Sequence, residues 1–433
     1  MNEALIGLRD RYLDQVFRLL DGESLIIMSG VRRVGKSFIA VQLEQELSRR
    51  FSNGAHVIRI GFEKIAHEIS TADELIAQIK GQYAFDKKNY FLFDEILGID
   101  DWERAINFLY CLDNCKVILI SSNRRVLSPE LKAVREENCE VIQVLPLSLN
   151  EFIQFQRFIE TSKPSVPLIE KQYTRFNDKT YTIHEIYKHY VTYGGLPILK
   201  PEYMGNDYAW VVSEGSYGAI ITRDVLEIES GDGFAAVTDP ILLRSVISAL
   251  IKSLGENISA TRIGKQTSRH LGRPNATKTI QSYIQALLNA HMFYIAERYD
   301  VRSGKILKTL PKYYVVDTCF HNYLSDTHVE DESRLLENAV FFELLRRGCK
   351  VYNGKLGHEV ITFVAIKGEE KFYIQVANDI SEDCAEQLFS PLRRIRDDST
   401  KMIIALGTTS SITYDGIVVM NGLEFLMENE FNW

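Results

Sequence analysis

Residues 30–37 read GVRRVGKS, which fits the phosphate-binding pattern G-x-x-x-x-G-K-[ST]. An apolar stretch of strand length, Leu25 to Met28, precedes this loop, and the segment from Phe38 to Leu47 follows it with apolar residues at helical spacing. This strand–loop–helix context separates a phosphate site from an incidental glycine turn. The loop, a Walker A pattern, therefore predicts a parallel α/β sheet that binds a nucleoside triphosphate at the carboxyl end of a strand.

The loop gives each of its positions an expected role. Gly30 and Gly35 allow the backbone to bend so that successive N–H groups point at the β-phosphate, beside a helix N-terminus. The Lys36 ammonium is expected to reach the β- and γ-phosphates, and the Ser37 hydroxyl to bind Mg²⁺. The predicted nucleotide contacts are Gly30, Val31, Arg32, Arg33, Val34, Gly35, Lys36, Ser37 and Phe38.

A second apolar strand downstream of the loop ends in two acids, as in a Walker B motif. Tyr90 to Phe93 is an uninterrupted apolar run, typical of a buried parallel strand, and Asp94 and Glu95 follow it directly. In open α/β sheets such a strand end is where ligands bind. We expect Asp94 to hold Mg²⁺ together with Ser37, and Glu95 to orient or deprotonate the attacking water.

Three more apolar stretches of strand length, at 56–60, 116–120 and 141–146, complete a set of five. Helical patterns at 72–81 and 101–110 lie between them, so the expected fold is a parallel three-layer α/β sheet. The strand at 116–120 closes on polar residues, where we expect Asn123, or next Ser122, to sense the γ-phosphate. Lys36, Glu95 and Asn123 are thus the predicted catalytic residues.

Composition sets limits on the class of protein. A chain of 433 residues exceeds one hydrophobic core and predicts several domains. No apolar run approaches the ~20 residues of a membrane span, and the N-terminus lacks a secretory pattern, so we expect a cytoplasmic protein with no membrane partner. The six cysteines form no CxxC pair and are interpreted as reduced thiols without a metal.

Motifs in a fixed order resemble a large prokaryotic family of AAA+-like P-loop ATPases that carry a C-terminal domain of unknown function. They are GVRRVGKS, LFDEI, DWE, ILISSNRRVLSPEL and LPLSLNEF, followed by YGGLP at 193–197, YYVVDT at 313–318, LLENAVFFELLRRG at 335–348 and YIQVA at 373–377. The resemblance covers nearly the whole chain. It implies ATP as the nucleotide, with hydrolysis to ADP and phosphate, and a winged helix plus a nuclease-like domain after the ATPase.

One departure from the family pattern concerns the rate of hydrolysis. Members tend to carry a Gly-Arg pair shortly before the LPLS strand, and that pair falls on Glu137 and Asn138 here. Arg124, Arg125 and Arg135 are nearby replacements for this arginine finger. Since such a finger contributes about 10³–10⁵ in rate, we expect slow turnover.

The region after the ATPase predicts a helical lid or connector at 161–255, with its turn at YGGLP. Within it Arg223 and Asp224 resemble a family position, but we interpret them as an ordinary ion pair on a helix surface. Residues 256–328 then read as a winged helix-turn-helix, with Ser259 as a helix cap and Ile280, Tyr283, Ile284 and Leu287 facing inward on the second helix.

The winged helix coincides with a basic island. Residues 257–312 hold ten Lys/Arg against two acids, a balance of +8 in a chain whose net charge is −8. The residues expected to contact double-stranded DNA are Thr277, Lys278 and Gln281 on the recognition helix, with Arg273, Arg302 and Lys305 around it. A winged helix that binds an unidentified protein partner is the open alternative.

The last range, 329–433, has the helix-and-strand outline of a PD-(D/E)xK nuclease without its metal ligands. Thr362 stands where the first acid belongs, Gln375 to Ala377 replace the acid-x-Lys, and only Glu337 remains. Because carboxylates must hold the Mg²⁺ that activates water, we expect a degenerate, non-catalytic domain. It would support dimerisation or DNA contact.

These predictions divide the chain into an AAA+-like ATPase at 1–160, the connector at 161–255, the winged helix at 256–328 and the nuclease-like domain at 329–433. The leading functional hypothesis is a nucleotide-dependent switch that hydrolyses ATP slowly and presents its winged helix to DNA. One alternative is an oligomeric motor acting on nucleic acid or protein. Another is a signalling protein that binds only protein.

Overall fold

The computed structural model of the chain describes residues 9–22, 25–51, 54–62, 69–175, 179–198, 201, 208–227, 237–324, 332–408 and 412–427. It separates into two compact units. Unit 1 comprises Met1–Leu145, Ser216–Ala236 and Ala286–His291, and unit 2 comprises Pro146–Gly215, Val237–Gln285 and Met292–Trp433. Each unit therefore combines segments that are distant in the sequence.

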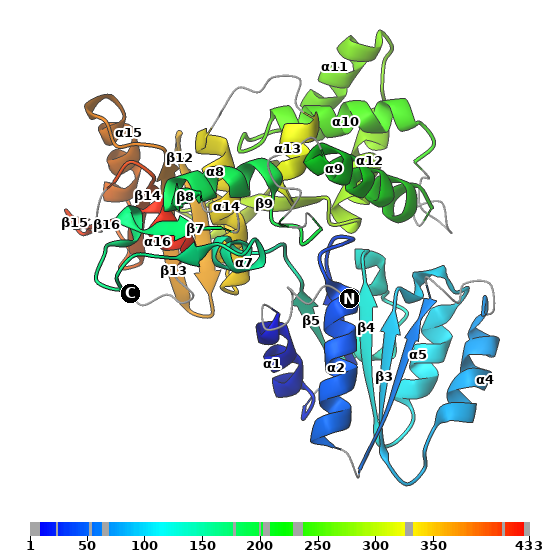
Figure 1. Cartoon of the computed structure of the whole chain (residues 1–433). Coiled ribbons are helices and arrows are strands. Elements are labelled where there is room, and N and C mark those ends of the chain that lie inside the picture. Colours follow the sequence, from blue (N-terminus) through cyan, green and yellow to red (C-terminus); the bar gives the residue numbers. More distant parts are fainter. Residues whose placement is uncertain are drawn as a thin grey trace. The chain divides into compact units, whose positions relative to one another are not determined.

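The sheet of unit 1 has five parallel strands in the order β2-β3-β4-β1-β5 (Figure 1). The strands are β1 (Leu25–Ser29), β2 (Ala55–Gly61), β3 (Lys88–Asp94), β4 (Cys115–Ser121) and β5 (Cys139–Gln143). The predicted parallel α/β sheet is confirmed. The fifth strand begins two residues earlier and ends three residues earlier than the expected range of 141–146.

Helices cover both faces of this sheet. The helices of the unit are α1 (Asp10–Leu19), α2 (Lys36–Arg50), α4 (Ala72–Gln82), α5 (Trp102–Tyr110) and the short α6 (Lys132–Arg135), with 3₁₀ turns η2 (Ile96–Gly98) and η3 (Arg124–Val126). Buried residues of α4 and α5, such as Leu75 and Leu109, form one apolar cluster with alternate strand residues such as Ile27 and Phe91. The buried residues of α2 lie outside that cluster, so α2 covers the opposite face.

The strand order fixes where the two nucleotide motifs meet. β4 lies between β1 and β3, with Ser29 opposite Ser121 and Asp94 opposite Ile120. Because the strands are parallel, the segments that follow β1, β3 and β4 leave the sheet at one edge. That edge collects the loop, the two acids and the polar tip at Ser122 and Asn123.

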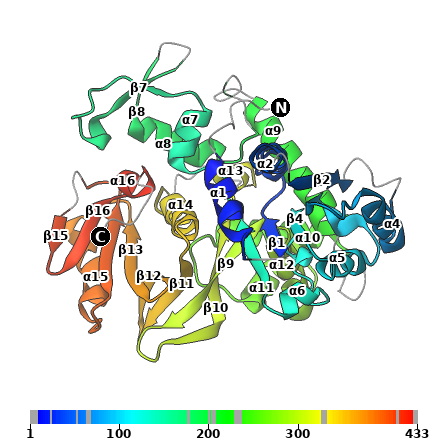
Figure 2. The same ribbon diagram turned by 90° about the horizontal axis from the view of Figure 1, so that it is seen from below.

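Unit 2 contains one mixed sheet of eight strands in the order β10-β9-β11-β12-β13-β14-β16-β15 (Figure 2). The strands are β9 (Phe293–Asp300), β10 (Lys305–Val315), β11 (Lys350–Leu356), β12 (Glu359–Lys367), β13 (Glu370–Ala377), β14 (Thr400–Ala405), β15 (Ile412–Tyr414) and β16 (Ile417–Asn421). β9 pairs with β11 in parallel, so the β9–β10 hairpin and the C-terminal strands share one sheet. Strands on both sides of the expected domain boundary at 328/329 therefore belong to the same sheet.

The helices of unit 2 include α11 and α12, which lie in the range where a helix-turn-helix is expected. They are α7 (Leu149–Phe155), α8 (Ile183–Tyr193), α10 (Pro240–Lys252), α11 (Ala260–Leu271), α12 (Thr277–Asn289, which runs into unit 1), α13 (Thr318–Leu324), α14 (Glu332–Arg346), α15 (Glu382–Arg393) and α16 (Gly422–Met427). The Ser259 side chain caps α11 by accepting from the N–H of Arg262 at 3.2 Å. Ile280, Tyr283, Ile284 and Leu287 are buried, as their spacing predicts.

The connector predicted at 161–255 as mostly helical contains strands in its first part. β6 (Ile159–Glu160), β7 (Gln172–Thr174) and β8 (Thr180–Thr182) form a three-stranded antiparallel sheet, with a 3₁₀ turn at Leu168–Glu170. Tyr173 and Tyr181 lie opposite each other across β7 and β8, and both are buried. The neighbouring Thr174, Thr180 and Thr182 are of a residue type that favours strands. Helices follow only from Ile183, where Thr182 forms a capping box with Glu185.

The described residues in the second part of that range are mostly helical, and those at 216–227 belong to unit 1. α9 (Tyr208–Ala219) continues directly into a π-helix, η6 (Ile220–Glu227). π-Helical turns are rare and often occur at functional sites. Within the described ranges, no helix is both long and apolar enough to cross a lipid bilayer. All six cysteines are free thiols.

Candidate nucleotide site

The backbone of the loop explains both of its glycines. Gly35 has φ of 100° at the start of α2, a conformation that side chains disfavour. At Gly30 a Cβ atom would lie 2.2 Å from the carbonyl oxygen of Val144, so only glycine allows the chain to pass there. The carbonyl oxygen of Gly35 accepts from the N–H groups of Phe38 and Ile39 at 3.1 Å. The loop thus closes onto the first turn of a helix, the geometry that favours a bound anion.

Lys36 lies over the loop, as expected of the phosphate-binding lysine. Its Nζ donates to the carbonyl oxygens of Gly30 at 2.9 Å and Val31 at 3.1 Å, and its side chain is 4% exposed. The same Nζ lies 3.7 Å from Oε1 of Glu95. The structure therefore brings the predicted lysine and the predicted general base together.

Glu95 lies after β3 in a strained position, with 12% of its side chain exposed. Its φ of 62° is left-handed, which a residue with a side chain rarely adopts, and such outliers concentrate at functional sites. Its Oε2 accepts from the backbone N–H of Ser122 and lies 3.0 Å from the Ser122 hydroxyl. Burial raises the pKa of Glu95, and the positive charges of Lys36 and Arg32 oppose that rise.

The oxygen donors expected to hold Mg²⁺ lie at two element ends. Asp94 is the last residue of β3 and is buried. Ser37 is the second residue of α2 and is exposed. A hydroxyl and a carboxylate suit Mg²⁺, which prefers hard oxygen ligands and retains several waters. The donor chemistry therefore fits the cofactor that the motif predicts.

The polar residues that follow β4, Ser122 and Asn123, form hydrogen bonds with other residues of unit 1. The Asn123 amide donates through Nδ2 to the carbonyl oxygen of Asp224 at 3.0 Å, and its Oδ1 accepts from the N–H of Arg125 at 2.9 Å. Ser122 rather than Asn123 contacts Glu95. Both residues are fully buried. The predicted sensor therefore lies beside the site, with its amide bound to protein groups.

Asp224 does not belong to a surface ion pair, so that interpretation is wrong. Its carboxylate is fully buried and accepts from Nε of Arg32 at 2.9 Å and Nη2 of Arg32 at 3.0 Å. It also lies 2.6 Å from the Ser122 hydroxyl. The adjacent Arg223 is exposed. Sequence spacing could not reveal this contact, because 192 residues separate Asp224 from Arg32.

The second loop arginine binds the same remote segment. Nη1 of Arg33 donates to the Ser216 hydroxyl at 3.1 Å. Arg32 and Arg33, both predicted nucleotide contacts, are therefore the two residues of the loop that reach the segment 216–227. This segment and the loop lie in the same unit.

Two further residues support the loop and were missed in the sequence. Arg9 is fully buried, and its guanidinium donates to the carbonyl oxygens of Val34 at 2.9 Å and Leu145 at 3.1 Å. His291 contacts Ser29 at the end of β1. Neither residue lies in a motif, so the sequence contained no local signal for either.

Two of the three candidate arginine fingers lie next to the polar tip of β4. Arg124 and Arg125 lie in η3 directly after Asn123, and both are partly buried. The side chain of Arg135 lies outside the described residues. Glu137 and Asn138 are exposed where the family arginine was expected.

The predicted DNA contacts in unit 2 are exposed. Thr277, Lys278 and Gln281 lie on α12, and Arg302 and Lys305 lie at the turn between β9 and β10. Arg273 forms an ion pair with Asp239 across the start of α10. Basic and polar groups are thus exposed both on α12 and at the β9–β10 turn.

The residues at the positions compared with nuclease metal ligands form hydrogen bonds with other side chains. The Thr362 hydroxyl donates to Oε1 of Gln375 at 2.7 Å, and Oε1 of Glu337 accepts from Nζ of Lys312 at 2.9 Å and from the Tyr314 hydroxyl at 2.6 Å. Among the described residues no three His, Cys, Asp or Glu side chains are grouped to hold a metal.

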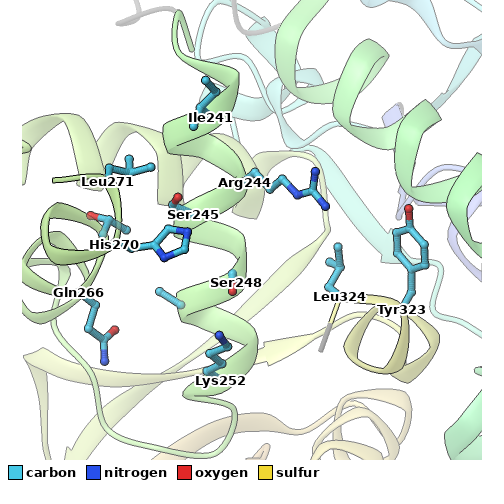
Figure 3. Close-up of a pocket in the computed structure, with 12 residues that line it drawn as sticks. Ile241, Arg244, Ser245, Ser248, Lys252, Gln266, His270, Leu271, Tyr323 and Leu324 are labelled. Carbon is cyan, nitrogen blue, oxygen red and sulfur yellow. The ribbon is translucent and has the colours of Figure 1, made fainter. Parts of the chain in front are cut away.

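A cavity of 670 Å³ lies elsewhere in unit 2, along α10 between α11 and α13 (Figure 3). Arg244, Ser248 and Lys252 line it from α10, His270 from α11 and Tyr323 from α13. None of the residues predicted from the motifs lines this cavity.

Comparisons with known proteins agree with this geometry. Residues 22–153 match the family described as AAA domain, and residues 184–331 match a domain of unknown function (DUF8612). An uncharacterized protein of Haemophilus influenzae is 29% identical over 433 residues, which are 99% of this chain and 100% of that protein. An uncharacterized protein of Methanocaldococcus jannaschii is 25% identical over 372 residues, 83% of this chain and 76% of that protein.

Among solved structures, the Walker-type ATPase of Pyrococcus abyssi is similar over 73% of this chain and 95% of its own length, at 16% identity and a TM-score of 0.49. At that score the likeness is loose, and the assignment depends on the residues of this chain. The AAA domain match, the parallel sheet and the loop together support an AAA+-like ATPase.

Proposed function

We propose that this protein binds ATP and Mg²⁺ at the loop of unit 1 and hydrolyses ATP slowly, as a nucleotide-dependent switch. One observation carries the proposal: Lys36 and Glu95, which are distant in the sequence, lie 3.7 Å apart at the edge where the loop and β3 end. The loop N–H groups and Lys36 would hold the β- and γ-phosphates. Ser37 and Asp94 would hold Mg²⁺, which supplies charge neutralisation at the phosphates when it is bound.

The geometry of Glu95 supports slow turnover. A base must be ionised and within reach of the attacking water. Burial raises the pKa of Glu95, and one of its oxygens is bound by Ser122. The raised pKa, the hydrogen bond from Ser122 and the missing family arginine all favour a low rate of ATP hydrolysis. A conformational change that breaks the hydrogen bond to Ser122 would raise this rate.

Isothermal calorimetry and single-turnover hydrolysis test this proposal. We expect Lys36→Ala to weaken ATP binding by at least 100-fold, because it removes the charge that the phosphates contact. Glu95→Gln should bind ATP like the wild type and lose turnover. Arg49→Ala, an exposed cation at the far end of α2, is the matched control and should change neither. Turnover faster than about 1 s⁻¹ without a partner would contradict a slow enzyme.

We further propose that the winged helix of unit 2 binds double-stranded DNA. The exposed set on α12 and at the wing, and the +8 balance of residues 257–312, support attraction to phosphate backbones. The nuclease-like strands would assist this contact or dimerisation without cutting. ATPase rates measured with and without duplex DNA distinguish this role from a winged helix that binds only protein. The mass of the protein with ATP tests for a homo-oligomer and thus for the motor alternative.

A further inference from the structure

Asp224 contacts the nucleotide site of unit 1 from a remote part of the sequence. It lies in the π-helix Ile220–Glu227, outside the range that matches the AAA domain. Its carboxylate accepts hydrogen bonds from both Nε and Nη2 of Arg32 and lies 2.6 Å from the Ser122 hydroxyl. Its own carbonyl oxygen accepts from Asn123. A single buried carboxylate is thus bound to the loop and to the tip of β4 at once.

The surroundings of Asp224 connect it to the phosphate site. The Ser122 hydroxyl lies 3.0 Å from Glu95, and Glu95 lies 3.7 Å from Nζ of Lys36. A hydroxyl has one proton, so Ser122 can donate to Glu95 or to Asp224 but not to both. Asp224 is therefore close to the lysine expected at the β- and γ-phosphates, with Ser122 and Glu95 between them, and it competes for a donor with the expected base.

A γ-phosphate can form the same kinds of interaction as the Asp224 carboxylate. Both are anions that accept hydrogen bonds, and a phosphate forms bidentate pairs with arginine as readily as a carboxylate does. A diphosphate ends at the β-phosphate, which the loop N–H groups and Lys36 satisfy. Only the third phosphate would extend toward Ser122 and Arg32.

We propose that Asp224 determines how strongly the site prefers a nucleoside triphosphate over a diphosphate, by occupying the Arg32 and Ser122 donors that a γ-phosphate takes. The proposal rests on the proposed function, because it assumes that the loop binds nucleotides. Binding of a triphosphate displaces Asp224 from these donors, whereas binding of a diphosphate leaves it in place. A displaced carboxylate cannot stay buried without partners, so the segment 220–227 moves. The release of Asp224 thus reports the third phosphate to the rest of the chain.

Asp224→Asn tests the proposal, with ADP and the non-hydrolysable triphosphate AMP-PNP as probes in calorimetry. The amide is almost isosteric but lacks the charge that pairs with Arg32. We expect AMP-PNP to bind about tenfold more tightly than to the wild type, since the variant competes less for the donors. The affinity for ADP should stay within about twofold. Glu227→Gln, an exposed acid on the same π-helix, is the control and should alter neither affinity.

Hydrogen exchange of the wild type is the second measurement, and it does not depend on the variant folding. AMP-PNP should change the exchange of residues 220–227, and ADP should not. Equal effects of both nucleotides, on affinity in Asp224→Asn or on exchange in the wild type, would show that Asp224 is a structural contact only. If the wild type bound neither nucleotide, the proposed function itself would fail, which is a different result.

Discussion

The hydroxyl of Ser29 and Nε2 of His291 lie 2.6 Å apart, although 262 residues separate them in the chain. Ser29 is the last residue of β1, directly before the loop, and His291 follows α12 with a left-handed φ of 54°. Burial, and then the charges of Arg124 and Lys36, hold the pKa of His291 well below its usual range. The imidazole is therefore neutral at the back of the phosphate loop.

Acidification should destabilise unit 1 through His291. In the unfolded chain the imidazole of His291 binds a proton near pH 6.5, whereas in the folded chain it stays neutral to lower pH. The free energy of unfolding therefore falls as the pH drops below about 6.5. We expect the melting temperature of the wild type to exceed that of His291→Gln at pH 7.5 and this difference to shrink toward pH 5. Thermal melts over that range measure it. His358→Gln, an exposed histidine in unit 2, should leave the pH profile unchanged.

Glu95→Gln should raise stability at neutral pH while it removes turnover. Because the pKa of Glu95 lies above its ordinary value of 4.5, the ionised carboxylate is unfavourable in the folded state, and stability is lost as pH rises through the raised pKa. The amide lacks this penalty and still offers an oxygen to Ser122. We expect a gain of about 1–2 kcal/mol at pH 8, and almost none at pH 4. Glu140→Gln, exposed on β5, provides the comparison; an equal gain in that variant, or a gain at pH 4, would contradict the assignment.

Gly30→Ala should destabilise the loop unit, because the added Cβ would lie 2.2 Å from a backbone oxygen of Val144 that cannot rotate away. We expect a loss of about 1–3 kcal/mol in denaturant unfolding, with weaker ATP binding. Gly81→Ala is the matched substitution, since Gly81 lies in α4 and a methyl group added there would meet no atom within 4 Å. There alanine should be neutral or stabilise by up to about 1 kcal/mol. Equal behaviour of the two variants would argue against a tight approach at Gly30.

Lys278→Ala should weaken binding to duplex DNA of any sequence, because a lysine near the start of the recognition helix neutralises phosphate charge. The plot of log affinity against log salt concentration should become shallower by about 1, the value for one lost phosphate contact. Fluorescence anisotropy at several salt concentrations measures this slope. Lys163→Ala, exposed in unit 2 away from the helix-turn-helix, should leave it unaltered. Wild-type binding that is absent, or independent of salt, would leave the winged helix with a protein partner.

Part of this protein could be predicted from the sequence because local patterns determine it. The loop depends on glycines and a lysine at fixed spacing, and the strand ending in Asp94 depends on a continuous apolar run. The parallel sheet and the inward face of α12 follow from the same periodicity. The antiparallel strands β7 and β8 were not predicted, because three-residue strands are too short to show a period.

The surroundings of the loop depend on contacts that form only in the folded chain. Arg9, His291 and Asp224 contact the loop or the strand ends from segments that no motif marks. Their roles depend on which buried donors and acceptors meet after the chain has folded, since each buried polar group must find a partner wherever the fold supplies one. Local sequence patterns thus placed a phosphate-loop motif at residues 30–37, and the fold brought the Asp224 carboxylate to its Arg32.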